Sequence, residues 1–212
     1  MGRNTARQSE QYNLSATVFS AQPGYDEAKV RQDFAGLMPL RTVIIYCFDP
    51  RAAGIPAAVA KELGDVYPGE AVTDSEGNAI GTTTTVLNVV VAGGRAMDAL
   101  RSITVAQHLL GVENVVVVHH THCGATSYTP AGIIAAHKAE HGQDISDLYP
   151  RESVAIADFA ASLEYDTRLI RDSAGTPPHV NVYGYLYDID TDELTRVTED
   201  PGAVQSEEVA KA

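Results

Sequence analysis

Hydrophobic and polar positions along the chain predict strands and helices in alternation. Residues 42–46 are β-branched or aromatic and apolar on both faces, which is typical of a buried central strand. Residues 82–91 and 115–118 have the same character and predict a second and a third strand. Residues 180–187 predict a last long strand, from which a turn leads into a short one at 194–197.

Helices are predicted between and before these strands. The helix at 96–110 has the clearest pattern, because its apolar residues recur at steps of three and four and Gly111 is a natural stop. Three further helices are predicted at 26–37, 52–63 and 152–172.

Loops and turns separate these elements. Residues 67–81 are polar and contain two turn dipeptides, so they are predicted to form a loop. The stretch before residue 152 is also predicted to be mostly loop. The pair Gly93-Gly94 predicts a flexible turn between the second strand and the helix that follows it.

The alternation of strand, helix and strand favours the α/β fold class, with a central, mostly parallel β-sheet flanked by helices. A length of 212 residues fits one domain. Residues 1–40 are polar and predict an N-terminal arm that carries the first helix. Residues 41–200 are then predicted to form the α/β domain, and residues 201–212 a frayed C-terminal tail.

The chain is acidic, with 15 lysines and arginines against 28 aspartates and glutamates and a formal charge of −13. A negative surface repels phosphate backbones and anionic lipids, which argues against nucleic acid and membranes as partners. No apolar stretch approaches the roughly 18 residues of a membrane-spanning helix. The first residues lack the apolar core of an export signal, so we expect a cytoplasmic protein without a structural disulfide.

The side chains best suited to chemistry follow two of the predicted strands. Cys47 comes directly after the first strand, and His120 and Cys123 come shortly after the third. The carboxyl ends of parallel strands are where α/β proteins bind their ligands. Two thiolates and an imidazole are three of the four ligands of a tetrahedral zinc ion, and an open fourth position marks a catalytic site. Taken singly, each of these residues is more usually a buried core residue than a ligand.

Together, the two motifs resemble the signature of the β-carbonic anhydrase family. Cys-x-Asp-x-Arg at 47–51 is followed some 70 residues later by His-x-x-Cys-Gly at 120–124. The resemblance covers roughly residues 41–197, and His-His-Thr-x-Cys-Gly is most like the branch that includes carbonyl sulfide hydrolases. It implies a β-carbonic anhydrase-like fold and one Zn²⁺ per subunit, bound by Cys47, His120 and Cys123.

The resemblance also implies a catalytic dyad. Asp49, held by Arg51, would either take the fourth zinc position or accept a hydrogen bond from zinc-bound hydroxide. A bidentate guanidinium–carboxylate pair fixes the direction of the acid, which then orients the hydroxide. The implied reaction is attack of zinc hydroxide on the central carbon of a small linear cumulene. Because two thiolates cancel the formal charge of zinc, we expect activity to be favoured by alkaline pH.

One departure from the family pattern bears on the substrate. Where these enzymes usually have Arg-Asn-Ala-Gly, this chain has Val90-Val91-Ala92-Gly93, which we expect to line the substrate pocket together with Phe48. Fewer polar donors would bind bicarbonate less well, which favours hydrolysis of carbonyl sulfide to hydrogen sulfide and carbon dioxide. The alternative is the reversible hydration of carbon dioxide to bicarbonate, with the two valines simply completing a strand.

Three more histidines accompany these motifs. His122 lies on the loop between two of the expected ligands and is a candidate proton shuttle. His119 should point to the face of the strand opposite His120 and pack there. His108 lies in the predicted helix at 96–110, where we interpret it as structural.

Two expectations concern the kind of protein and its partners. A non-catalytic zinc or redox sensor would use the same three ligands, but it would have no need of the pair formed by Asp49 and Arg51. Besides a small-molecule substrate, the resemblance implies a homodimer or homotetramer, with the N-terminal arm lying on a neighbouring subunit.

Overall fold

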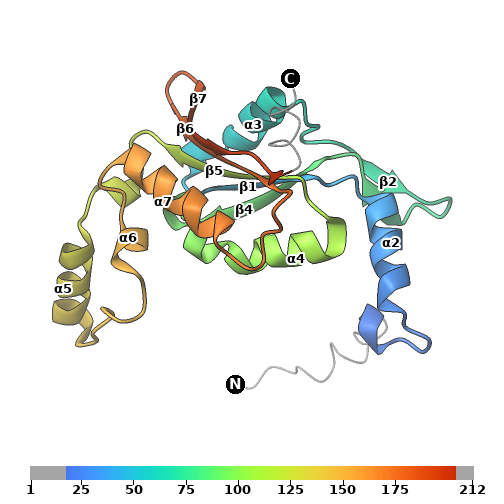
Figure 1. The fold of residues 1–212 in the computed structure, drawn as a ribbon, viewed down its shortest axis with the longest axis horizontal. Helices are drawn as coiled ribbons and strands as arrows, with labels where there is room; N and C mark the ends of the chain where they lie inside the picture. The colour runs from blue at the N-terminus through green and yellow to red at the C-terminus, as the bar shows by residue number, and fades with distance from the viewer. Residues whose placement is uncertain (1–17, 204–212) are drawn as a thin grey trace, which may run out of the picture.

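A five-stranded sheet forms the centre of the computed structural model, which describes residues 18–203 (Figure 1). The strand order is β4-β1-β5-β6-β7, and all neighbours are parallel except β6 and β7. The strands are β1 (Thr42–Cys47), β4 (Val86–Val91), β5 (Asn114–His120), β6 (Asn181–Tyr187) and β7 (Leu194–Asp200).

The residue types of these strands explain their places in the sheet. The middle strands β1 and β5 are buried along nearly their whole length, and the four valines at 115–118 have no exposed surface. Strands covered on both faces need apolar side chains throughout, which is the pattern that these segments have. The edge strand β7 is mostly exposed and polar, as a sheet edge usually is.

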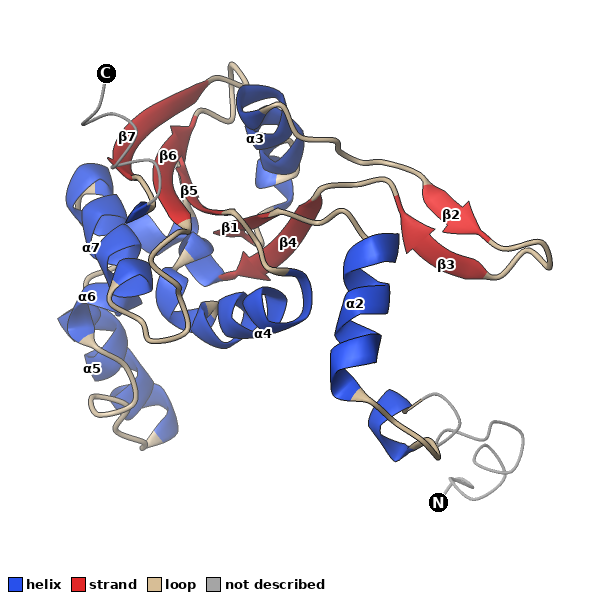
Figure 2. Ribbon diagram, turned by 45° about the vertical axis from the view of Figure 1, so that its right-hand side comes forward, coloured by secondary structure: helices blue, strands red, loops and turns tan. Residues whose placement is uncertain are grey.

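Helices cover both faces of the sheet, and each face has its own apolar cluster (Figures 1 and 2). The cluster under α3 includes Ile44 and Val116, whereas the cluster under α4 and α7 includes their neighbours Ile45 and Val117. Successive side chains of a strand thus pack on opposite faces of the sheet. The three helices are α3 (Ile55–Leu63), α4 (Leu100–Leu110) and α7 (Phe159–Arg171).

Two parts of the chain project from this three-layered body (Figure 2). The helix α2 and a hairpin of β2 and β3 project at one end, and α5 and α6 lie at the other (Figure 1). None of the residues of α2 or α5 is buried. These elements are α2 (Glu27–Leu37), β2 (Ala71–Thr73), β3 (Ala79–Thr82), α5 (Pro130–His141) and α6 (Arg151–Val154). Short 3-10 turns complete the order: η2 (Phe19–Ala21), η3 (Pro50–Ala52), η4 (Ala92–Gly94), η5 (Ala96–Asp98) and η6 (Gly124–Thr126).

The predicted α/β class with a mostly parallel, helix-flanked sheet is confirmed, but the predicted loop at 67–81 is wrong. Residues 71–82 contain the hairpin, whose turn is closed by the Asp74 carboxylate accepting hydrogen bonds from the backbone of Glu76 and Asn78. The following strand accordingly begins at Val86 rather than at residue 82.

The predicted helix at 152–172 is also wrong, because two helices occupy that range. α6 ends at Val154, and Asp158 starts α7 by accepting a hydrogen bond from the backbone of Ala161 at 2.8 Å. Between them the Ile156 N–H donates to the carbonyl of Ala125 at 2.9 Å, which holds the chain out of helical geometry.

The remaining helix predictions need smaller corrections. α5 occupies part of the stretch predicted as loop, and Thr129 caps its start. The helices predicted to start at residues 52 and 96 begin at Ile55 and Leu100, each after a 3-10 turn. No helix within residues 18–203 is long and apolar enough to cross a membrane. Residues 1–17 of the predicted arm and 204–212 of the predicted tail lie outside the described residues.

Candidate metal centre

The expected metal ligands meet at one edge of the sheet. Cys47 is the last residue of β1 and His120 the last residue of β5, and these two parallel strands are neighbours. Cys123 follows three residues later, at the start of η6. The sulfur atoms of the two cysteines and a ring nitrogen of His120 all lie within 4.8 Å of one another. The structure therefore brings together three residues that are far apart in sequence.

The spacing and burial of these atoms fit a tetrahedral zinc site. The two sulfurs are 3.9 Å apart. Two thiolates at about 2.3 Å from a tetrahedral zinc ion lie roughly 3.8 Å from each other. The exposed fractions of Cys47, His120 and Cys123 are 4%, 0% and 2%, so water competes little for the ligand atoms.

The orientation of His120 leaves one nitrogen available to a cation. Its Nδ1 lies 2.9 Å from the carbonyl oxygen of Thr121, and a carbonyl only accepts, so Nδ1 carries the proton. Nε2 is then a lone-pair donor, and it is buried without a hydrogen-bond partner. A backbone carbonyl on the outer nitrogen is the usual way in which proteins orient a metal-binding imidazole. The residues present therefore fit a zinc ion.

The thiol of Cys123 is held protonated in the metal-free chain. Burial raises its pKa to about 11, and the neighbouring Cys47 adds to the effect. A thiol binds zinc as the thiolate, so a cation that occupies this site has to displace the proton.

Asp49 and Arg51 form the expected pair beside the ligands. Arg51 donates from Nε to Asp49 Oδ1 at 3.0 Å and from Nη2 to Oδ2 at 2.6 Å. The backbone N–H of Arg51 also donates to Oδ1 at 3.0 Å, because Asp49 caps the turn that begins at Pro50. These contacts hold the pKa of Asp49 well below its usual range, so the carboxylate stays ionised.

Arg51 also ties the two halves of the site together. Its Nη2 donates to the carbonyl of His122 at 3.0 Å, on the loop between His120 and Cys123. His122 itself has a left-handed backbone with φ of 55°, which reverses the chain between the two ligands. A single guanidinium thus orients the Asp49 carboxylate and fixes the carbonyl of the metal-binding loop.

Known proteins resemble the chain in sequence and in fold. No family model matches the chain. It is 31% identical to "Beta-carbonic anhydrase 1" of Mycobacterium tuberculosis and of Mycobacterium bovis. The matched segment has 103 residues and makes up 48% of this chain. The chain spans 60% of the length of these curated relatives.

Solved structures share the fold over nearly the whole chain. A carbonic anhydrase from Streptococcus mutans is 23% identical, with a TM-score of 0.57 over 93% of this chain and 100% of that one. A carbon disulfide hydrolase is 19% identical, with a TM-score of 0.55 over 90% and 91% of the two chains. The chain is similar in sequence to β-carbonic anhydrases and has their fold. The resemblance stated from the two motifs is therefore confirmed.

In this β-carbonic anhydrase fold, a glycine turn packs behind the candidate metal ligands. Gly93 and Gly94 have φ values of 64° and 67°, which side chains other than glycine rarely adopt. A Cβ on Gly94 would lie 2.7 Å from the carbonyl oxygen of Val118 and 3.2 Å from the nitrogen of Cys47. The turn therefore touches both strands that carry the ligands.

The opposite face of β5 holds a buried charged group. His119 points away from the metal centre, as predicted, and its Nε2 lies 3.2 Å from the Asp166 carboxylate of α7. Asp166 also accepts two hydrogen bonds from Arg95, at 2.8 and 3.2 Å. Burial lowers the pKa of His119, partly offset by Asp166. His119, Asp166 and Arg95 are all at most 2% exposed.

Arg95 and Asp166 are the residues that the sequence predictions missed. Arg95 also donates to the carbonyls of Glu152 and Ala155, so it holds the chain between α6 and α7. An arginine directly after a glycine turn at a strand end was the available signal. Its partner Asp166 lies 71 positions away in the sequence, on the buried face of α7.

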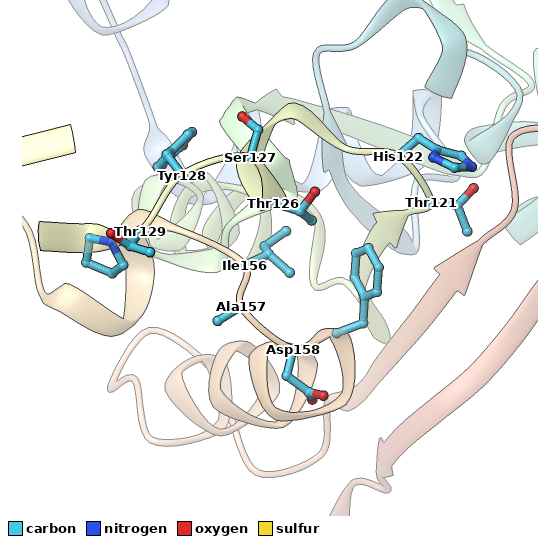
Figure 3. A pocket seen from close by; sticks show the side chains of 11 residues that line it. Thr121, His122, Thr126, Ser127, Tyr128, Thr129, Ile156, Ala157 and Asp158 are labelled. Atoms are coloured by element: carbon cyan, nitrogen blue, oxygen red, sulfur yellow. The ribbon is translucent and has the colours of Figure 1, made fainter. Parts of the chain in front are cut away.

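A cavity of about 580 Å³ opens beside the metal-binding loop (Figure 3). Thr121 and His122 lie at one end of it, and Tyr128 and Thr129 lie at the other. His122, the candidate proton shuttle, has a side chain that is 70% exposed and lies 3.9 Å from Asp190. The imidazole is thus exposed to solvent at the edge of the cavity.

The expected pocket residues are placed in different surroundings. Phe48 and Val90 are 66% and 49% exposed, close to the end of β1 and β4. Val91 is the register partner of Cys47 but packs with the cluster under α4. Ala92 lines a second cavity of about 260 Å³, and Gly93 is buried.

Proposed function

We propose that this chain is a zinc enzyme of the β-carbonic anhydrase type that adds water to a small linear cumulene. The observation that carries the proposal is the buried group of Cys47, His120 and Cys123, with the Nε2 of His120 unpartnered. These residues would hold one zinc ion per subunit. Three protein ligands leave a fourth position open, which is the arrangement of catalytic zinc sites.

When bound, zinc would supply an acidified water as the nucleophile and a positive charge for the anion that develops. The remaining work falls to side chains of the chain. Asp49 stays ionised and can only accept a hydrogen bond, so it would orient the nucleophile's proton away from the substrate. Arg51 keeps that carboxylate in place, and His122 would carry protons to solvent.

Carbonyl sulfide is the substrate we favour, with carbon dioxide as the alternative. Val90 and Val91 occupy the end of β4, where Val91 is aligned with Cys47 and accepts a hydrogen bond from Phe48 N through its carbonyl. Valines offer no donors to bicarbonate, whereas they tolerate a less polar substrate that contains sulfur. That the same fold serves a carbon disulfide hydrolase is consistent with this choice.

A homodimer or homotetramer is the assembly we propose. The arm and the hairpin expose apolar side chains around a groove of about 690 Å³, among them Phe19 at 59%, Leu37 at 43% and Ile80 at 42%. Apolar surface of this kind is usually covered by a partner. Light scattering coupled to size exclusion tests the assembly. We propose a cytoplasmic location, which suits thiolate ligands because the cytosol keeps thiols reduced.

The decisive experiment measures metal content and two activities on one preparation. We expect one zinc per chain, sulfide release from carbonyl sulfide, and slower hydration of carbon dioxide in stopped flow. Replacing Val90 and Val91 by Arg and Asn should shift the ratio of the two rates towards carbon dioxide, by roughly tenfold if a few hydrogen bonds decide it. Efficient hydration with no sulfide release would reverse the substrate assignment. Absence of both activities from the zinc-loaded chain would favour a zinc or redox sensor.

A further inference from the structure

Two histidines of α5 form a pair that the proposed catalytic site does not use. His137 and His141 are one helical turn apart, with ring centroids 4.8 Å from each other and ring planes at 58°. α5 lies at the end of the molecule opposite the hairpin (Figure 1). The side chain of His141 is 61% exposed, so a hydrated cation can reach it.

The distance between the two ring centroids is the one expected when both imidazoles bind the same cation. Imidazole nitrogens bind zinc at about 2.1 Å, which puts each ring centroid about 3.2 Å from the metal. For bond angles between about 90° and 109°, two such centroids lie roughly 4.5 to 5.2 Å apart. The observed 4.8 Å falls within that interval.

The sequence around the pair also has the spacing of a known type of metal motif. His137 and Glu140-His141 form His-x-x-Glu-His on one helix, a spacing that zinc peptidases also use. Such peptidases complete the site with a third ligand from elsewhere in the chain. Among the described residues, the only group of three or more close ligands is that of Cys47, His120 and Cys123. The α5 pair therefore offers two imidazoles, with water in the other positions.

Charges around the pair favour a cation. Lys138, which follows His137 in the sequence, forms an ion pair with Asp144 at 2.9 Å. The Glu140 carboxylate lies 3.8 Å from Nε2 of His141, close enough to attract a cation bound there. His141 is the last residue of α5, where the helix dipole favours positive charge.

We propose that His137 and His141 form a second, weaker site for a divalent transition metal such as Zn²⁺ or Ni²⁺. Magnesium and calcium are excluded, because they prefer oxygen ligands. The bound cation would cross-link two side chains of the last turn of α5 and so stabilise it. This helix buries none of its residues and gains little from packing. α5 contributes Ile133 to the cavity that Ala92 also lines. A more stable α5 would therefore hold one wall of this cavity in place.

The test uses the full chain after its buried site has been loaded with one equivalent of zinc. Equilibrium dialysis against Ni²⁺ in excess Mg²⁺, read by elemental analysis, should show one further equivalent bound. The variants are His137→Ala, His141→Ala and the double variant, with His179→Ala as an exposed single-histidine control. Hydrogen exchange of the α5 amides should slow when Ni²⁺ is added to the wild type.

Chelation makes a specific prediction about these variants. Each single substitution should weaken the second site by roughly tenfold to a hundredfold, because one imidazole remains, and the double variant should lose the site. The control should bind like the wild type. Absence of a second equivalent, or its persistence in the double variant, would overturn the proposal. Zinc in the buried site is unaffected by these variants, so this result is separate from that of the proposed catalytic function.

Discussion

His119 and His120 are consecutive residues of β5 with opposite surroundings. Both have no exposed surface, burial lowers the pKa of both, and each has one ring nitrogen without a partner. The difference lies in what each imidazole faces. His120 faces two sulfurs, whereas His119 faces the Asp166 carboxylate. An unpartnered nitrogen therefore does not identify a metal ligand by itself; the neighbouring ligand atoms do.

The largest loss of activity should come from a substitution among the three candidate metal ligands. We expect His120→Ala to lower bound zinc severely and turnover by about a thousandfold or more, because several kcal/mol of barrier lowering depend on the metal. Elemental analysis and the activity assay check both. The neighbouring variant His122→Ala should keep its zinc, and a His120→Ala chain that still binds one equivalent would refute the ligand assignment.

On the opposite face, the expected loss is in stability. Asp166→Ala leaves the Arg95 guanidinium buried without its carboxylate, which typically costs about 3–5 kcal/mol of unfolding free energy. Urea denaturation measures the loss, and elemental analysis should still find zinc in the folded fraction. Glu164→Ala, an exposed position on the same helix, should change stability by less than about 0.5 kcal/mol. Equal losses in the two variants would argue against a role for the buried pair.

A third substitution separates binding from turnover on the metal face itself. Asp49→Ala should retain zinc but lower turnover by about a hundredfold, because the nucleophile loses its orienting acceptor. Asp144→Ala breaks an exposed ion pair with Lys138 and serves as the control, with unchanged turnover. Full turnover in Asp49→Ala would remove the dyad from the mechanism.

The smallest effect concerns pH. A histidine whose pKa is lowered in the folded state binds a proton more readily when unfolded, so its contribution to stability is complete above the unfolded pKa. That contribution is lost as the pH falls below about 6.5, by up to about 1.4 kcal/mol per pH unit. In the metal-free chain His120 adds a similar slope. His119→Asn should therefore reduce the slope without abolishing it; an unchanged slope would show that His119 does not titrate on unfolding.

Most of the metal centre could be predicted because its residues belong to local motifs. Cys47, Asp49 and Arg51 lie within one turn of chain, and so do His120 and Cys123. The pairing of β1 with β5, which brings the two motifs together, had to be supplied by the fold. Asp166 could not be found in this way, because its role depends on where α7 packs.

The errors in the fold have local causes that were partly visible. The hairpin strands are three and four residues long, too short for a clear alternation of apolar and polar side chains. The break before α7 follows from tertiary contacts, since Arg95 binds the Glu152 and Ala155 carbonyls. α5 did leave a signal, because Thr129-Pro130 is a favourable helix start and Gly142 a favourable end.

The turn at Gly93-Gly94 limits how the proposed active site can be redesigned. Any larger residue at Gly94 meets the backbone of Val118 and Cys47, where neither strand can yield without moving a ligand. Libraries intended to widen substrate range should therefore keep this turn fixed and vary Phe48 and Val90, whose exposed side chains leave room for change. In such experiments we expect substitutions to be tolerated at Phe48 and Val90 but not at Gly94, although Val90 and Gly94 are only a few residues apart.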